Sequence, residues 1–308
     1  MSASLPIGTR GSPLALWQAE HVRDRLAANH GTDRGAASLS VISTSGDQIQ
    51  DKPLADFGGK GLFTKEIDEA LLRGDIALAV HSMKDLPTRL PEGLRLAAVL
   101  PRADVRDAFL SPVAASLAAL PAGAVVGTSS LRRAAQVKRA RPDLDVIDFR
   151  GNVQTRLRKL GDGVADATLL AKAGLDRLGL ADKATSVLAV DDMLPAVAQG
   201  AIGVVARCDD AETLTLLQPL NDAATEIAVT CERAFLAQLD GSCRTPIAGL
   251  ASVEGDTIRF RGLILSPDGA EWHEVEMSGP GTEAEAIGRK AGEDVRGRAG
   301  LALLEMLS

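Results

Sequence analysis

The chain repeats one local pattern, in which a short apolar strand ends in a polar turn and a helix follows. Strands of this kind are predicted at 5–9, 39–43, 76–80, 94–100, 124–127, 146–149, 167–171 and 201–206. Helices are predicted after most of them, and the first helix has Ser12 as its N-cap and Pro13 at its first position. This alternation predicts an α/β fold built on parallel sheets.

The last third of the chain has a different pattern. A long helix is predicted at 223–239, and two strands at 257–265 and 271–277 are joined by a turn. A final helix is predicted at 283–307. Strands grouped together and flanked by helices are typical of a small α+β domain. We therefore expect two α/β units followed by a smaller α+β domain.

The composition excludes several classes of protein. Of the 308 residues, 45% are hydrophobic and 24% are charged, which is typical of a globular chain rather than a disordered or fibrous one. Aromatic residues make up only 3%, with no tyrosine, so stacking of single-stranded nucleic acid is not expected. The net charge is 34 − 41 = −7, which also argues against a nucleic-acid partner.

Known sequence signals are also missing. Residues 1–10 lack the basic and apolar regions of a signal peptide, and no apolar run reaches the roughly 18 residues of a membrane span. The spacing of Cys208, Cys231 and Cys243 fits no zinc site, and four scattered histidines do not indicate one. The chain contains no GxxxxGK[ST], GxGxxG, HExxH or GxSxG motif. We expect a soluble cytoplasmic protein without a bound metal ion.

The turns that follow the predicted strands carry polar and basic side chains. Ligands in open α/β sheets bind beyond the carboxyl ends of the strands, where helix N-termini attract anions and arginine recognises carboxylates. Residues 131–160 contain nine basic and three acidic residues, a local charge of 9 − 3 = +6. Part of this run can be two solvated helix faces, whereas Arg132, Arg133 and Arg150 lie at strand-to-helix turns. These turns predict a site for a polyanionic small molecule.

Two further residues are candidates for chemistry. Asp85 follows a buried apolar strand, beside Lys84, and is either a catalytic carboxylate or a structural turn residue. Cys243 lies beside Arg244 in a loop rich in turn residues, and is either a nucleophile with a lowered pKa or an incidental cysteine. Cys231 lies among apolar neighbours and is expected in the core, and His81 is expected to be structural.

Eight segments of the chain together resemble one family, the porphobilinogen deaminases, also called hydroxymethylbilane synthases. They are IGTRGSPLALWQA (7–19), GGKGLFTKEI (58–67), AVHSMKDLP (79–87), VVGTSSLRRAAQ (125–136), FRGNVQTRLRKL (149–160), LAKAGLDRLGL (170–180), LPAVAQGAIG (194–203) and DGSCRTPIAG (240–249). They follow the order of the family over nearly the whole chain. The resemblance implies a transferase that condenses four porphobilinogen molecules head to tail, with loss of ammonia, and releases hydroxymethylbilane for tetrapyrrole (haem) biosynthesis.

The resemblance also implies a cofactor and a set of site residues. The family holds a dipyrromethane cofactor through a thioether to a loop cysteine, a position that Cys243 matches, and Asp85 matches its catalytic aspartate. Arg132 and Arg133 match residues that hold cofactor carboxylates, and Arg10, Arg150 and Arg156 are candidates for the incoming substrate. The full set of matching cofactor and substrate contacts is Arg10, Ser12, Lys60, Ser82, Lys84, Thr128, Ser129, Ser130, Arg132, Arg133, Arg150, Gly151, Asn152, Arg156, Arg177 and Gln199.

The fold that the resemblance implies agrees with the pattern of strands and helices. Two α/β domains resemble a type II periplasmic binding protein, at residues 1–103 with 200–219 and at residues 104–199. A C-terminal α+β domain, residues 220–308, carries the cofactor cysteine. The chain departs from the family pattern at Ser45, Asp56 and Ala198, where an arginine, a lysine and a glycine are common. These departures put only local contacts in doubt.

Two other functions use the same features. A non-catalytic anion-binding protein of this fold predicts a signal peptide or lipid anchor and needs no reactive cysteine. The effector domain of a transcription regulator predicts an N-terminal helix-turn-helix, but here a strand is expected from residue 5. The resemblance favours an enzyme that acts on porphobilinogen as a monomer, with neither a nucleic-acid nor a membrane partner.

Overall fold

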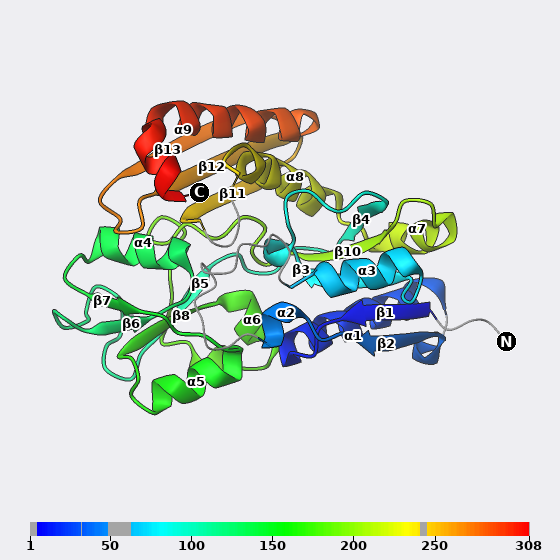
Figure 1. Cartoon of the computed structure of the whole chain (residues 1–308), viewed down its shortest axis with the longest axis horizontal. Helices are drawn as coiled ribbons and strands as arrows, with labels where there is room; N and C mark the ends of the chain where they lie inside the picture. The colour runs from blue at the N-terminus through cyan, green and yellow to red at the C-terminus, as the bar shows by residue number, and fades with distance from the viewer. Residues whose placement is uncertain (1–4, 32, 49–62, 241–244, 308) are drawn as a thin grey trace. The chain divides into compact units, whose positions relative to one another are not determined.

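The computed structural model describes residues 5–31, 33–48, 63–240 and 245–307. The described residues form two compact units, one from 5–48, 63–103 and 201–226, and one from 104–200 and 227–307. Each unit is described by itself, and Figure 1 labels most helices and strands of both.

The first unit is built on a five-stranded sheet with the strand order β2-β1-β3-β10-β4. Its strands are β1 (Leu5–Thr9), β2 (Ala37–Val41), β3 (Leu78–Ser82), β4 (Leu94–Val99) and β10 (Ile202–Arg207). β1 is parallel to β2 and β3, but β10 is antiparallel to β3 and β4. The predicted parallel pairing is confirmed for β1, β2 and β3, whereas β10 pairs in the antiparallel sense. The chain leaves this sheet after β4 and comes back only with β10, which enters in the opposite direction.

Several helices accompany this sheet. They are α1 (Pro13–His30), α2 (Ser45–Gln48), α3 (Lys65–Arg73), α7 (Ala211–Leu217) and the short 3₁₀ helices η1 (Arg34–Ala36), η3 (Met83–Asp85) and η5 (Gln218–Leu220). Of these, α1, α3 and α7 contact the strands of the sheet. The predicted start of α1 is confirmed, because Ser12 Oγ accepts the N–H of Ala15 at 3.3 Å and Pro13 is the first helical residue. Val22 of α1 packs with Leu78 and Val204 of the sheet in the core.

The second unit contains another five-stranded sheet, with the order β7-β6-β8-β5-β9. Its strands are β5 (Asp107–Leu110), β6 (Val125–Gly127), β7 (Asp145–Ile147), β8 (Ala167–Ala171) and β9 (Ser186–Val187). Its helices are α4 (Leu131–Ala140), α5 (Val153–Gly161), α6 (Lys172–Arg177) and the 3₁₀ helix η4 (Ala181–Lys183). β6 is parallel to β7 and β8, whereas β5 is antiparallel to β8 and β9, so this sheet is also mixed.

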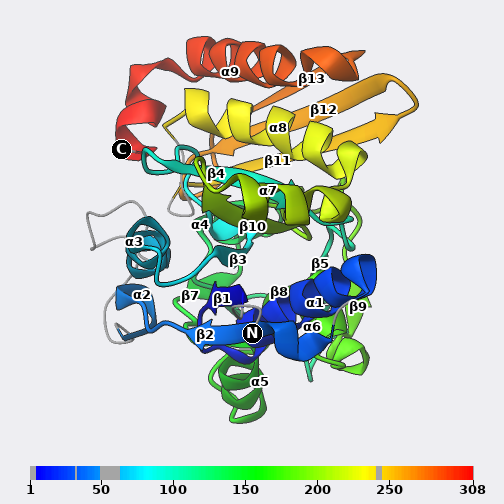
Figure 2. The ribbon, with the colours of Figure 1, turned by 90° about the vertical axis from the view of Figure 1, so that its right-hand side faces the viewer.

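The rest of the second unit is an antiparallel three-stranded sheet with helices. Its elements are α8 (Ala223–Gln238), β11 (Ile247–Glu254), β12 (Thr257–Leu265), β13 (Trp272–Pro280), η6 (Gly281–Glu283) and α9 (Ala284–Leu307). Residues of α8, α9 and the three strands share one core, in which the rings of Phe235 and Phe260 lie 5.0 Å apart. α8 and α9 run side by side (Figure 2), and a Cβ at Gly288 would lie 2.0 Å from the Cys231 carbonyl oxygen.

The predicted α/β class with a small α+β part is confirmed, with small shifts in some strands. The strand expected at 76–80 lies at 78–82, and Ile76, just before it, is also buried. β11 was not predicted, since its small residues follow a loop rich in turn residues. The boundary proposed at residue 220, between a second and a third domain, stays a prediction.

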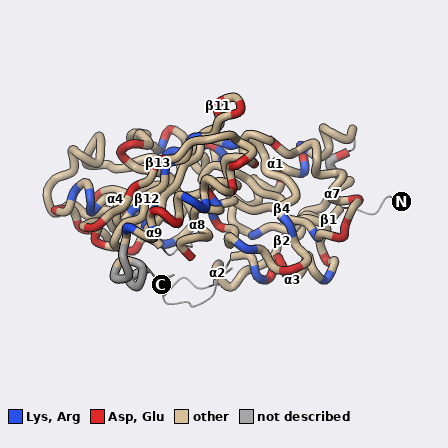
Figure 3. The backbone as a smooth tube through the Cα atoms, turned by 90° about the horizontal axis from the view of Figure 1, so that it is seen from above, with Lys and Arg blue, Asp and Glu red and all other residues tan. Residues whose placement is uncertain are grey.

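Charged residues of both signs are spread along the chain (Figure 3). Within the part of the chain that the structure describes, no helix combines the length and apolar character that crossing a bilayer requires.

Candidate functional site

In the first unit, candidate residues follow two neighbouring parallel strands. Arg10 and Ser12 come after β1, and Ser82, Lys84 and Asp85 come at the end of β3 and in η3. Because β1 and β3 are adjacent and parallel, their carboxyl ends lie at the same edge of the sheet. The sequence analysis predicted this grouping.

Asp85 is only loosely paired with its neighbouring arginine. Nη1 of Arg10 lies 4.0 Å from Oδ2 of Asp85, and the two side chains are 21% and 34% exposed. The Arg10 guanidinium also lies 4.3 Å from the centre of the Phe63 ring, an aromatic contact that the sequence did not indicate. A partly exposed carboxylate is accessible, which suits it to a cationic or N–H-bearing ligand.

Ser82 is held by a buried residue of α1. Nε2 of Gln18 donates to the Ser82 hydroxyl at 2.8 Å, and Gln18 is only 1% exposed. Sequence reasoning missed Gln18, although a polar residue on the apolar face of a predicted helix is a signal that could have indicated it.

His81 is a buried neutral histidine, in agreement with its expected structural role. Burial, with a smaller contribution from the charge of Arg10, lowers the pKa of His81 to about 4. Its Nε2 atom is buried, and within the described residues it has no hydrogen-bond partner. Protonating this ring inside the sheet is therefore costly.

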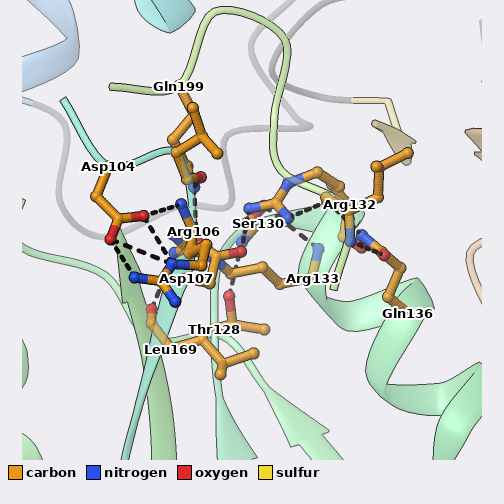
Figure 4. A network of polar contacts seen from close by, with 12 residues as sticks. Asp104, Arg106, Asp107, Thr128, Ser130, Arg132, Arg133, Gln136, Leu169 and Gln199 are labelled. Carbon is orange, nitrogen blue, oxygen red and sulfur yellow. Dashed lines mark hydrogen bonds and ion pairs between the residues drawn. The ribbon is translucent and has the colours of Figure 1, made fainter. Parts of the chain in front are cut away.

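In the second unit, a buried carboxylate lies at the centre of the candidate site. Oδ2 of Asp107 accepts from Arg132 Nη2, and its Oδ1 accepts from Arg133 Nη2 and Gln199 Nε2, each at 2.8 Å (Figure 4). Asp107 has no exposed surface, and both arginines are 5% exposed or less. Three of the residues predicted to bind cofactor or substrate are thus joined by an aspartate that was not among the predicted site residues.

The charge of Asp107 is stabilised from several directions. Burial alone raises the pKa of this carboxyl group, but the two guanidinium charges and the hydrogen bonds from Arg133 and Gln199 hold it well below its usual range. Each arginine also donates to a backbone oxygen, Arg132 to Leu194 at 2.7 Å and Arg133 to Leu169 at 2.9 Å. The pair is therefore rigidly placed before any ligand binds.

The arginine pair still has unused donors. The Nε atoms of Arg132 and Arg133 are buried and have no hydrogen-bond partner among the described residues. One buried carboxylate faces two guanidinium groups, which leaves a net positive charge. A further carboxylate would satisfy both the free N–H groups and the charge, so these residues fit a ligand that carries acetate or propionate groups.

The hydroxyl groups after β6 shape the turn that begins α4. Thr128 Oγ1 accepts the N–H of Ser130 at 3.2 Å, and Ser130 Oγ accepts the N–H of Arg133 at 3.5 Å as the N-cap. Ser129 Oγ accepts the N–H of Phe149 at 3.1 Å. All three predicted binding residues thus have a structural role, and each hydroxyl can still donate one hydrogen bond to a ligand.

The turn after β7 places further cationic groups at the same edge of the sheet. Asn152 caps α5 by accepting the N–H of Thr155 at 2.9 Å, and Gly151 has a φ of +118°, which favours glycine. Arg156 Nε donates to the Gly151 oxygen at 2.8 Å. Burial, followed by the charges of Arg133 and Arg150, lowers the pKa of Arg156 to about 10. These neighbouring positive charges favour an anionic ligand.

Arg177 follows β8 in α6. Its Nη2 donates to the Gly200 oxygen at 2.7 Å, and burial lowers its pKa to about 10. β8 lies beside β6 and is parallel to it, so the carboxyl ends of both strands lie at the same edge of the sheet. Arg133, after β6, and Arg177, after β8, therefore both come from helices that begin at this edge. In the second unit the structure therefore brings together the candidate residues that follow β6, β7 and β8.

Two predicted site residues, Lys60 and Cys243, lie outside the described residues. Asp56, one of the departures from the family pattern, also lies outside them. Ser45, another departure, donates its backbone N–H to Glu66 Oε1 at 2.9 Å. Cys231 is buried and Cys208 is exposed.

Comparison with known families gives two matches along the chain. Residues 5–215 match the model described as "Porphobilinogen deaminase, dipyromethane cofactor binding domain". Residues 226–297 match the model described as "Porphobilinogen deaminase, C-terminal domain". The two matches together cover both units.

Solved structures with a similar arrangement include the methionine-binding protein MetQ. It has a TM-score of 0.45 and 15% identity, over 70% of this chain and 89% of that one. A putative methionine-binding lipoprotein from Bacillus subtilis gives a TM-score of 0.42 with 13% identity, over 70% and 89% of the two chains.

Relatives of known name match over almost the whole length. The porphobilinogen deaminase of Nitrobacter winogradskyi is 59% identical, over 96% of this chain and 93% of that protein. That of Paracoccus denitrificans is 58% identical over 95% and 94%, and the chloroplastic enzyme of Pisum sativum is 58% identical over 97% and 83%. With both family models matched and this identity sustained along the chain, the protein belongs to the porphobilinogen deaminase family.

Proposed function

We propose that this chain joins four porphobilinogen molecules head to tail with loss of one ammonia for each, and that one water molecule releases the product as the linear tetrapyrrole hydroxymethylbilane. The family is one of transferases that contain a dipyrromethane cofactor domain. One observation carries the proposal. Arginines and helix-start donors gather at the carboxyl ends of parallel strands, while one partly exposed carboxylate, Asp85, follows β3.

Asp85 is the proposed catalytic residue. When porphobilinogen loses ammonia, positive charge develops on the pyrrole and its methylene carbon, and an ionised carboxylate stabilises that charge. The same carboxylate accepts hydrogen bonds from pyrrole N–H groups and holds the rings in position for the new carbon–carbon bond. The side chain of Asp85 is 34% exposed and its contact to Arg10 is 4.0 Å long, so both oxygens can turn toward a substrate.

Arg132 and Arg133 are the proposed holders of the cofactor carboxylates. Their buried Nε–H groups and the excess positive charge around Asp107 fit the acetate and propionate groups of the two pyrroles. Cys243 is the proposed attachment point, through a thioether. When bound, the dipyrromethane supplies the pyrrole end to which the first substrate unit is joined, and it stays on the protein after product release.

The remaining candidates are proposed to bind the carboxylates of the incoming and growing chain. Each pyrrole adds one acetate and one propionate, so the number of carboxylates rises with every condensation. Arg10, Arg150 and Arg156 are the proposed contacts of the incoming substrate. The other proposed contacts are Ser12, Lys60, Ser82, Lys84, Thr128, Ser129, Ser130, Gly151, Asn152, Arg177 and Gln199.

The proposal includes the setting in which the enzyme works. Its partner is the small molecule porphobilinogen, and a net charge of −7 opposes binding to nucleic acid. We further propose that the protein acts as a monomer in the cytoplasm.

Intact-protein mass spectrometry with peptide mapping tests the proposal. The purified protein, or the protein after incubation with porphobilinogen, should carry the added mass of two deaminated porphobilinogen units on the peptide that contains Cys243. Cys243→Ser should lose this adduct, whereas Cys208→Ser, at an exposed cysteine, should keep it. An adduct that persists in Cys243→Ser would contradict the attachment site. A wild-type chain that gains no adduct and releases no ammonia would contradict the function.

A further inference from the structure

A second buried carboxylate, Glu232 of α8, contacts the backbone of two other segments. Its Oε2 accepts the N–H of Ala198 at 2.5 Å, and its Oε1 accepts the N–H of Ala251 of β11 at 2.7 Å. Glu232 has no exposed surface. A carboxylate withdrawn from water is unfavourable unless its oxygens are hydrogen-bonded, so these contacts define where both segments lie.

The segment held by Oε2 has an unfavourable backbone conformation. Ala198 has a φ of +59° and is 1% exposed, and a residue with a Cβ rarely adopts this left-handed conformation. The charge-assisted hydrogen bond from its N–H to Glu232 compensates for that preference. The turn of residues 198–200 therefore depends on Glu232 more strongly than it would if residue 198 were a glycine.

This turn places two groups of the candidate site. Gln199, the next residue, donates from Nε2 to Asp107 Oδ1 and to the Val105 oxygen, each at 2.8 Å. Gly200, one residue further, accepts from Arg177 Nη2 at 2.7 Å. A shift of the turn would thus move the support of Asp107 and the support of Arg177 together.

Asp107 in turn holds both guanidinium groups of the arginine pair, as Figure 4 shows for Gln199, Asp107, Arg132 and Arg133. We propose that Glu232 is a positioning residue, which fixes the turn of residues 198–200 and thereby aims Arg132, Arg133 and Arg177 at ligand carboxylates. The inference rests on the proposed function, because it assigns these arginines to carboxylate binding. Glu232 itself is not a catalytic residue, since it acts only through the turn.

Glu232→Gln is the direct test. The amide keeps the shape of the side chain, but its nitrogen cannot accept a hydrogen bond, so one backbone N–H loses its partner. We expect KM for porphobilinogen to rise about tenfold, which corresponds to about 1.4 kcal/mol, with a smaller change in kcat. If Glu232 had a purely structural role, Glu232→Gln would lower the melting temperature and leave the KM of the folded enzyme unchanged.

A matched control is available on the opposite edge of the second unit's larger sheet. Oδ2 of Asp166, just before β8, accepts the N–H of Val125 at the start of β6 at 2.7 Å. Asp166→Asn removes the same charge at the amino ends of these parallel strands, and its amide oxygen can still accept the Val125 N–H. It should leave KM unchanged.

Rescue by glycine separates the two roles further. In the Glu232→Gln background, Ala198→Gly should bring KM back to within about threefold of the wild type, because glycine adopts the left-handed conformation without the cost of a Cβ. Ala198→Val, in which Glu232 is retained, should raise KM as Glu232→Gln does, since a β-branched residue disfavours this conformation. This variant also tests the proposal if Glu232→Gln does not fold.

The outcomes distinguish this inference from the proposed function. The adduct on the wild-type chain and its turnover of porphobilinogen test the function and are measured first. Wild-type KM in folded Glu232→Gln, or in folded Ala198→Val, would overturn the positioning role. So would a raised KM in Glu232→Gln that Ala198→Gly does not lower.

Discussion

Two aspartates, each next to arginine, have opposite surroundings in the two units of this protein. Asp107 has no exposed surface, and its two oxygens receive three hydrogen bonds of 2.8 Å from Arg132, Arg133 and Gln199. Asp85 is 34% exposed, and its ion pair with Arg10 is long, at 4.0 Å. The same pairing of residue types gives a fixed structural element in one unit and an accessible group in the other.

The difference shows why the presence of an arginine does not identify a catalytic carboxylate. Asp107 is fully paired, so it cannot contact a substrate without giving up hydrogen bonds in a buried position, which is costly. Asp85 can approach a cationic group with little rearrangement. We therefore expect changes at Asp85 to alter the rate, and changes at Asp107 to alter stability and cofactor retention.

The largest expected effect is on turnover, in Asp85→Ala. Loss of the carboxylate should lower kcat by about a thousandfold or more, because the developing positive charge is no longer stabilised. The melting temperature should stay close to that of the wild type, since Asp85 has one weak ion pair. Steady-state kinetics and thermal unfolding of the same preparation measure both quantities.

Asp75→Ala is the control for that change. Asp75 is exposed, lies in the same unit and accepts from Arg73 Nε at 2.8 Å. It should leave kcat unchanged. Normal turnover in Asp85→Ala would remove its catalytic role, and with it the contrast with Asp107.

The next effect in size is on stability, in Asp107→Asn. Removing the charge leaves two buried guanidinium groups without their counter-ion, which should lower the free energy of unfolding by about 3–5 kcal/mol. Arg132 and Arg133 would then lose their alignment, so the folded fraction should also retain less covalent cofactor. Denaturant unfolding and intact-protein mass measure the two effects.

Asp104→Asn is a close comparison for this variant. Asp104 lies three residues earlier and pairs with the half-exposed Arg106 at 2.6 Å. Its loss should cost less than about 1 kcal/mol, because the pair remains in contact with water. Equal losses of stability in Asp107→Asn and Asp104→Asn would show that burial does not determine how much each aspartate contributes to stability.

The sequence predicted local elements well where neighbouring residues determine them. α4 at 131–140 and β12 at 257–265 lie where the apolar pattern and the turn residues placed them, and Ser12 caps α1 as expected. The directions of β5 and β10 were not predictable in the same way. They depend on where the chain re-enters a sheet, which no local pattern records.

The candidate site shows the same division. The polar turns after the strands were predicted, because strand and helix patterns locate the carboxyl ends of parallel strands. Asp107 and Glu232 were missed, since their partners are distant in sequence. An acid inside an apolar strand or helix is the available signal, because such a residue is rarely buried without a partner.

The third prediction concerns acid sensitivity, which should arise in the unit that contains Asp85. The folded-state pKa of His81 is about 4, below its ordinary value of 6.5, so the unfolded chain binds more protons between these values. The stability that neutral His81 supports is present above pH 6.5 and is lost as the pH falls toward 4, by up to about 3 kcal/mol. Denaturant unfolding at several pH values measures this loss.

His81→Gln should flatten that pH dependence, and His273→Gln should not. His273 is partly exposed and pairs with Glu271 at 3.0 Å. Asp107 should remain ionised in the folded protein throughout this pH range, because its pKa lies well below the range, so it should not account for the loss of stability. An unchanged pH profile in His81→Gln would assign the acid sensitivity to another group.

The smallest predicted effect has the opposite sign and comes from Asp68 of α3. This carboxyl group is 4% exposed, its Oδ1 has no hydrogen-bond partner within the described residues, and burial raises its pKa to about 6. The folded chain therefore binds more protons than the unfolded chain between pH 3.8 and 6, and Asp68 destabilises the fold once it ionises above pH 6. Asp68→Asn should raise the free energy of unfolding by about 1–2 kcal/mol at pH 8, with a gain that shrinks toward pH 4. Asp75→Asn, at an exposed carboxylate, should show no such gain. A gain of equal size at both pH values would mean that packing, rather than the buried charge, distinguishes Asp68 from Asp107, whose charge is fully paired.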